Sequence, residues 1–119
     1  MRSTDEVTTW ALADIRNAIA RREVSPVEVV EAHLDRIAGD DTNAVGTIAD
    51  DALDHARAAE HAVMRDAPLG SLHGVPFTAK DVLDTEGLRT TAGSRIFRDY
   101  LPRRDAEAVA ALRRAGAIL

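Results

Sequence analysis

Residues 72–81 read LHGVPFTAKD. The glycine and proline near the start of this stretch are typical of a turn that leads the chain into an extended segment. Residues 77–83 (FTAKDVL) then predict a buried strand. Side chains alternate between the two faces of a strand, which places Lys80 and Asp81 on opposite faces. We therefore expect these two charges not to pair with each other.

Lys80 is the single lysine of the chain, because 14 of the 15 basic residues are arginines. Codon preference explains such an excess where only surface charge matters. An amine differs from a guanidinium in one respect that matters for chemistry, since a desolvated amine can lose its proton. In a buried strand Lys80 would be a candidate general base or Schiff-base former. The alternative is a structural lysine whose stem is buried and whose head reaches water.

The regions on either side of this stretch predict four helices. Apolar spacing and capping signals place them at residues 9–22, from Ser25 to about Ala38, from Asp50 or Asp51 to about Met64, and from Asp105 to Gly116. The second has the clearest start, because Ser25 and Glu28 form a capping-box pattern around Pro26. Gly39 is its expected end.

Two further segments predict strands, at residues 43–49 and 117–119. Helices alternating with strands indicate an α/β fold, in which helices cover the sheet. Three short strands make a small sheet, and an apolar strand at the end of the sequence would leave an unpaired edge. We therefore expect residues 1–119 to be part of a larger domain. No internal repeat, linker or low-complexity stretch divides them.

The block at residues 72–81 closely resembles the first conserved block of the amidase signature family, in which His-Gly-Val-Pro precedes a lysine-aspartate pair. The resemblance continues through residues 90–94 (TTAGS), 105–109 (DAEAV) and 114–119 (RAGAIL). It implies that residues 1–119 are the N-terminal portion of a single amidase domain. The implied fold is α/β, with helices packed around a mixed β-sheet that is incomplete in this chain.

The resemblance also implies a reaction. Family members hydrolyse carboxamide C–N bonds with a Ser-Ser-Lys triad, and Lys80 matches the lysine that serves as general base. Both serines, and the glycine- and serine-rich loop whose amides would hold the tetrahedral intermediate, are expected beyond residue 119. None of the serines present has such surroundings: Ser3, Ser25, Ser71 and Ser94. We expect Ser94 to line or support the cleft, and His73 to have no catalytic role.

Three alternatives remain open. The resemblance also covers the A subunit of glutamyl-tRNA amidotransferase, which passes ammonia to a charged tRNA and requires partner subunits. A truncated or split-gene product without catalytic activity would equally lack the serines. A Schiff-base enzyme would use Lys80 differently. Because both serines are missing, we expect the isolated chain to have no amidase activity.

Composition limits the partners. A net charge of −5 argues against direct nucleic-acid binding and against an anionic membrane. No cysteine and no long apolar run are present, which agrees with a cytoplasmic protein without a signal peptide. His55, Glu60 and His61 lack the spacing of a zinc motif, so we predict neither metal nor cofactor. The expected partners are a small amide substrate and the missing part of the domain, and a homo-oligomer is left open.

Overall fold

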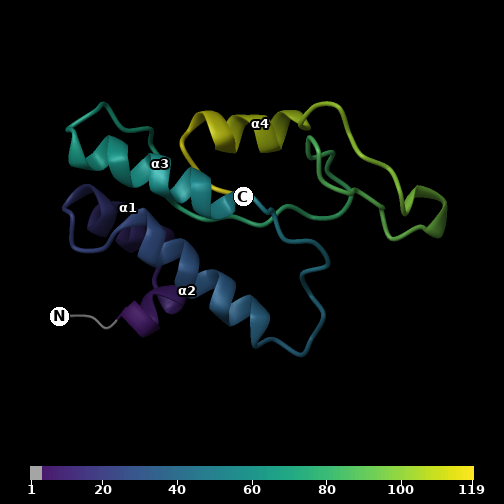
Figure 1. Cartoon of the computed structure of the whole chain (residues 1–119), viewed down its shortest axis with the longest axis horizontal. Helices are drawn as coiled ribbons and strands as arrows, with labels where there is room; N and C mark the ends of the chain where they lie inside the picture. Colours follow the sequence, from purple (N-terminus) through teal and green to yellow (C-terminus); the bar gives the residue numbers. More distant parts are fainter. Residues whose placement is uncertain (1–3) are drawn as a thin grey trace.

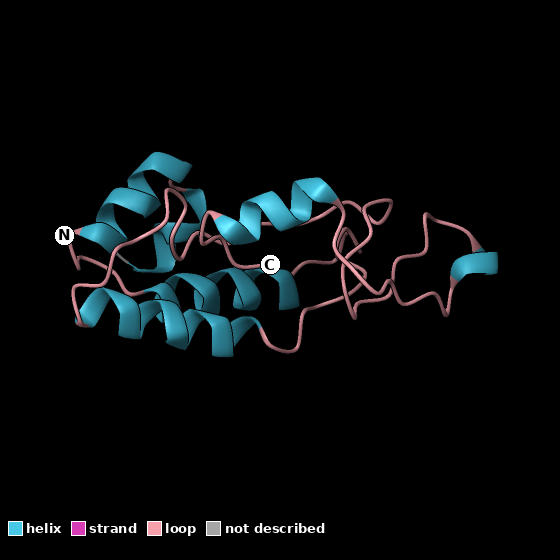
Figure 2. Cartoon of the chain, turned by 90° about the horizontal axis from the view of Figure 1, so that it is seen from above, coloured by secondary structure: helices cyan, strands magenta, loops and turns pink. Residues whose placement is uncertain are grey.

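The computed structural model describes residues 4–119 (Figure 1). Its elements in chain order are the 3₁₀ helix η1 (Thr4–Thr9), α1 (Leu12–Ala20), α2 (Pro26–Ala38), α3 (Ala52–Met64), the 3₁₀ helix η2 (Arg95–Phe97) and α4 (Glu107–Arg114). We call residues 4–76 together with 107–119 the helical part. Residues 78–106 form the arm, which extends away from the helices and carries η2 (Figures 1 and 2).

Aliphatic side chains from η1, α1, α2 and α3 make the core of the helical part. One cluster joins Val7, Ile19, Val29 and Val63, and Val75 at the end of the turn packs into it. A second cluster lies between α2 and α3, where α3 presents alanines at helical spacing. Small side chains allow two helices to approach closely. The alanine face of α3 therefore lets it pack closely against α2.

The capping box of α2 is present as predicted. The Ser25 hydroxyl accepts a hydrogen bond from the backbone N–H of Glu28 at 3.1 Å. The Glu28 carboxylate accepts one from the Ser25 N–H at 2.8 Å. Pro26 occupies the first turn and Gly39 is the C-cap. Two of the helix's free N–H groups are thus satisfied by side chains.

Other helix boundaries differ from the prediction. The first α-helix spans Leu12–Ala20 and not residues 9–22, and residues 4–9 form the separate helix η1. Asp51 precedes α3 but does not cap it, and its carboxylate lies 3.1 Å from Nε2 of His55 instead. Asp105 does not cap α4 either. Its carboxylate accepts a hydrogen bond from the Glu86 N–H at 2.7 Å and lies 3.0 Å from Nε of Arg113.

The predicted strands do not form within residues 4–119. Residues 43–49 and 77–83 are irregular, and only Pro76 and Ile118 make a parallel bridge. Around that bridge the Phe77 N–H donates to the Ile118 carbonyl at 2.8 Å, and the Ile118 N–H donates to the Val75 carbonyl at 2.9 Å. Strands are stable only as members of a sheet. The expected mixed sheet is therefore reduced to this single parallel contact in the described residues.

Hydrogen bonds hold the two limbs of the arm together. Backbone N–H groups of Gly87, Thr90 and Ala106 donate across it, to Pro102, Tyr100 and Asp84 respectively, at 2.7 to 3.1 Å. Most of its large apolar side chains face solvent, with Ile96 87% exposed, whereas Leu88 packs against the second core cluster. The arm thus has ordered backbone contacts but little apolar packing.

Candidate functional site

Lys80 lies where the arm begins, three residues after the last hydrogen bond of the bridge. Its side chain is exposed, and its carbonyl accepts a hydrogen bond from the Leu83 N–H at 2.9 Å, which closes a tight turn. The prediction of a buried strand around Lys80 is therefore wrong for this chain. Burial of a strand requires elements on both sides of the sheet, and the described residues supply none here.

Asp81 connects this turn to residues 91–93. One carboxylate oxygen accepts a hydrogen bond from the Thr91 N–H at 2.7 Å, and the other accepts one from the Thr91 hydroxyl. The Asp81 carbonyl accepts a third from the Ala92 N–H at 2.7 Å. The Thr91 hydroxyl oxygen also accepts a bond from the Gly93 N–H at 3.2 Å. The carboxylate is thus directed to Thr91, in line with the expectation that it does not pair with Lys80.

These bonds lower the pKa of the Asp81 carboxyl below its ordinary value. The main cause is the hydrogen bond from the Thr91 hydroxyl, followed by that from the Thr91 N–H. Both stabilise the charged form. At the other end of the arm, desolvation raises the pKa of Tyr100, and its hydroxyl donates to Asp84 at 3.2 Å.

The serines make structural contacts. Ser25 caps α2, as predicted. The Ser94 hydroxyl accepts a hydrogen bond from the Ile96 N–H at 3.2 Å and so caps η2. The Ser94 N–H in turn donates to the Thr91 carbonyl at 2.9 Å, which places Ser94 beside the Asp81 contacts. Ser71 is exposed on a turn, and Ser3 lies outside the described residues.

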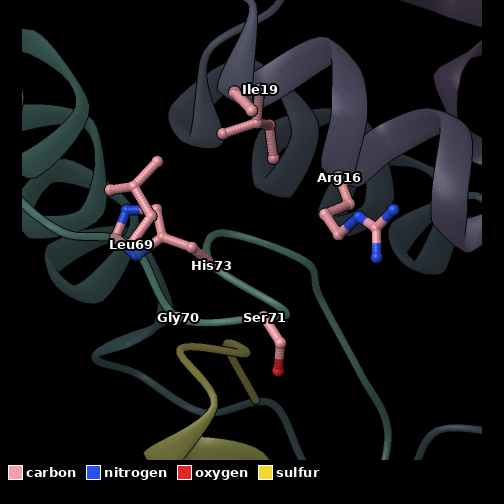
Figure 3. A pocket seen from close by; sticks show the side chains of 7 residues that line it. Arg16, Ile19, Leu69, Gly70, Ser71 and His73 are labelled. Atoms are coloured by element: carbon pink, nitrogen blue, oxygen red, sulfur yellow. The ribbon is translucent and has the colours of Figure 1, made fainter.

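His73 contacts the backbone of α3. Its Nε2 lies 2.9 Å from the carbonyl oxygen of Ala59, and the imidazole must donate this bond. His73 also borders an open cavity of about 240 Å³ between α1 and residues 69–73. The Arg16 guanidinium, the Ser71 hydroxyl and the His73 ring point in different directions there (Figure 3). Polar groups that do not converge give no basis for orienting a ligand.

Within residues 4–119, no group of three or more histidine, aspartate or glutamate side chains is placed to hold a metal ion. The exposed pair of Asp51 and His55 stands alone at one end of α3. Every helix of the described chain is too short or too polar to cross a membrane.

A comparison with known protein families identifies the family of this chain. The family model described as Amidase matches residues 28–119, which include the turn, Lys80 and the whole arm. The chain belongs to the amidase signature family. The resemblance seen in residues 72–81 and 90–94 is therefore confirmed over most of the chain.

Curated relatives of this amidase-family chain fall into two kinds. It is 42% identical over 117 residues to the A subunit of the glutamyl-tRNA(Gln) amidotransferase of Salinispora tropica, covering 96% of the chain and 24% of that protein. It is 38% identical over 116 residues to an indoleacetamide hydrolase of Bradyrhizobium diazoefficiens, covering 95% and 22%. The chain thus spans about a quarter of the length of the curated relatives it matches.

Solved structures of amidases share the fold of this chain. The native peptide amidase of Stenotrophomonas maltophilia superposes with a TM-score of 0.83 at 34% sequence identity, over 90% of the chain and 23% of that protein. Such neighbours have the α/β amidase signature fold, which agrees with the predicted fold class. The helical part and the arm are therefore an amidase-like arrangement in which the sheet is reduced to one bridge.

Proposed function

We propose that Lys80 of this amidase-family chain is the general base in hydrolysis of a carboxamide C–N bond. The observation that carries the proposal is the position of Lys80. It is the one lysine of the sequence and lies inside the matched family block, between the bridge and the Asp81 contacts. A lone lysine among 14 arginines is consistent with a requirement for an amine that can lose its proton.

The proposed mechanism uses two serines that are absent from residues 1–119. The neutral amine of Lys80 takes a proton from a bridging serine, which takes one from the nucleophilic serine as that serine attacks the amide carbon. The amine product leaves with a proton, and water then releases the acid from the acyl-enzyme. Lys80 is exposed in this chain, and covering it with the rest of the domain would favour its neutral form.

The A subunit of a glutamyl-tRNA amidotransferase is the second candidate. The 42% identity to such a protein favours it. In that case the ammonia released from an amide would be transferred to a charged tRNA, and partner subunits would be needed. Ammonia release by the protein without tRNA or partners would favour a simple hydrolase.

Residues 1–119 alone offer no candidate nucleophile. None of the serines at positions 3, 25, 71 and 94 has a glycine- and serine-rich block around it. We expect no amide hydrolysis by residues 1–119 alone, measured as ammonia release from simple carboxamides. Turnover that disappears in a Lys80→Ala variant would contradict this expectation.

The base assignment is tested in the complete polypeptide that the gene encodes. We expect Lys80→Ala to lower kcat by about 10²- to 10⁴-fold, the usual contribution of a general base. Lys80→Arg should be nearly as damaging, because a guanidinium stays charged. Arg57→Ala, an exposed substitution on α3, is the matched control and should retain activity. Full activity in Lys80→Arg would overturn the proposal.

The complete polypeptide also allows a test that distinguishes the general-base mechanism from a Schiff-base mechanism at Lys80. A Schiff base between Lys80 and a carbonyl compound would be trapped by borohydride as a stable adduct at position 80. We expect no adduct. The proposed partners are a small amide and the remaining part of the domain, and the proposed location is the cytoplasm.

A further inference from the structure

We propose that Asp81 and Thr91 are positioning residues for Lys80. This inference rests on the proposed function, because it assigns them the task of holding the backbone from which the base projects. They form what we call the clamp: the contacts that the Asp81 carboxylate and carbonyl make with Thr91 and Ala92.

The clamp joins residues 78–82, which have few other contacts, to the loop at residues 91–93. Residues 78–82 have exposed or half-exposed side chains and belong to no helix or strand. On their N-terminal side, the last fixed point is the Phe77 N–H in the bridge to Ile118. On their C-terminal side, the first residue held by hydrogen bonds to another segment is Asp81 itself. Fixing an exposed backbone costs conformational entropy, and polar bonds at both ends are what offset that cost here.

The clamp fixes Lys80 through the residue directly after it. Both the carbonyl and the side chain of Asp81 accept hydrogen bonds, so its backbone is held from two directions. The turn bond from the Leu83 N–H to the Lys80 carbonyl orients the peptide between the two residues. A catalytic group must be held close to its productive geometry to be effective.

The clamp also bears on the charge of Lys80. A carboxylate that ion-paired with the amine would favour its charged form and so oppose its use as a base. Both oxygens of the Asp81 carboxylate instead accept hydrogen bonds from Thr91. The adjacent acid is thereby directed to the loop at residues 91–93.

The chain itself allows a direct test, because labelling with ¹⁵N-lysine gives one backbone amide signal, that of Lys80. Thr91→Val removes the hydroxyl and Thr91→Ser keeps it. Thr42→Val is the matched control, since the Thr42 hydroxyl contacts the Asp40 carboxylate in another loop. We expect the Lys80 amide to become mobile on the nanosecond timescale in Thr91→Val and Asp81→Ala, and to stay as in the native chain in Thr91→Ser and Thr42→Val.

Hydrogen exchange at the Ala92 amide measures the strength of the clamp in the loop at residues 91–93, because this N–H donates to the Asp81 carbonyl. We expect exchange about 10- to 100-fold faster in Thr91→Val, the effect of losing a hydrogen bond to a charged group. Thr91→Ser should exchange at the native rate. If the Lys80 signal and the Ala92 exchange rate are the same in all the variants, the inference is wrong.

Kinetics in the complete polypeptide separate this inference from the proposed function. We expect Thr91→Val to lower kcat about tenfold or more with little change in KM, and Thr91→Ser to restore it. If Lys80→Ala abolishes activity but Thr91→Val and Asp81→Ala keep the native kcat, the clamp inference fails and the base assignment stands. If Lys80→Ala is fully active, the proposed function fails, and the clamp's role in catalysis fails with it.

Discussion

The helical part and the arm are stabilised by different interactions. The buried alanine, valine and isoleucine side chains of the described residues all lie in the helical part, from Val7 to Ile118. The buried polar side chains, Thr85 and Thr90, both lie in the arm, and each donates to a carbonyl two residues away. Apolar burial therefore stabilises mainly the helical part, and hydrogen bonds mainly the arm.

This difference bears on how each region depends on the rest of an amidase domain. Apolar side chains at positions 82, 96, 97, 100 and 101 of the arm are between 43% and 87% exposed. Soluble proteins seldom leave such a group uncovered. The helical part buries its apolar side chains in two clusters, to which the arm contributes only Leu88. Most large apolar side chains of the arm, which carries Lys80 at its base, remain exposed.

The same substitution in each region gives the largest expected contrast. Ile19 is 1% exposed in the core and Ile96 is 87% exposed on η2. We expect Ile19→Ala to lower the free energy of unfolding by about 3 to 4 kcal/mol, since it removes buried methyl groups and leaves a cavity. Ile96→Ala should change it by no more than about 0.5 kcal/mol. Urea unfolding followed by circular dichroism measures both, and equal losses would show that the arm has an apolar core of its own.

Two glycines with left-handed backbones give the next contrast. Gly116 has a φ of +91°, and a Cβ there would lie 2.9 Å from the backbone Cα of His73. Gly93 in the arm has a φ of +70° with no atom within 4 Å of such a Cβ. We expect Gly116→Ala to cost about 2 to 3 kcal/mol, from backbone conformation and overlap together. Gly93→Ala should cost about 1 kcal/mol, from conformation alone. A smaller loss for Gly116→Ala in thermal unfolding would mean that residues 73 and 116 separate easily.

Substituting the two capping serines should give a smaller difference in unfolding free energy. Ser25 begins a helix of 13 residues with a complete capping box, and Ser94 begins the three-residue helix η2. We expect Ser25→Ala to cost about 1 kcal/mol of unfolding free energy, and Ser94→Ala a few tenths. The same urea measurement checks them. A larger loss for Ser94→Ala would place the arm within the cooperative unit of the helices.

Features that depend on neighbouring residues in the sequence could be predicted. The Ser25 capping box and the end of α2 at Gly39 involve contacts across three or four residues, which the sequence specifies directly. The family could also be identified, because residues 72–81 and 90–94 are specific in combination. The role of Lys80 was inferred from its chemistry and from the same block, and it stays a prediction.

Features that depend on distant partners were missed. The strand at residues 77–83 was predicted from its apolar character, yet a strand needs neighbouring strands that the described residues do not supply. Asp105 has the character of a helix cap, but its carboxylate bonds to the Glu86 N–H and lies beside Arg113. The bonds between Asp81 and Thr91 span ten residues without any periodic signal. Only an aspartate and a threonine at the two ends of a turn-rich segment hint at them.

Acid should loosen the arm while leaving the helices folded. The pKa of Asp81 lies below its ordinary value of 3.8, chiefly because of Thr91, with a smaller contribution from the charge of Arg89. The clamp's stabilisation is therefore complete above pH 3.8 and is lost as pH falls through the lower pKa of the folded protein. We expect the Thr91 amide proton shift to titrate with a midpoint below 3.8, while the amides of Ile19 and Val29 keep their native shifts. A Thr91 midpoint at or above 3.8 would mean that the Asp81 bonds do not persist in solution. Loss of the Ile19 and Val29 signals at the same pH would mean that arm and helices unfold together, and the comparison between the two regions would not hold.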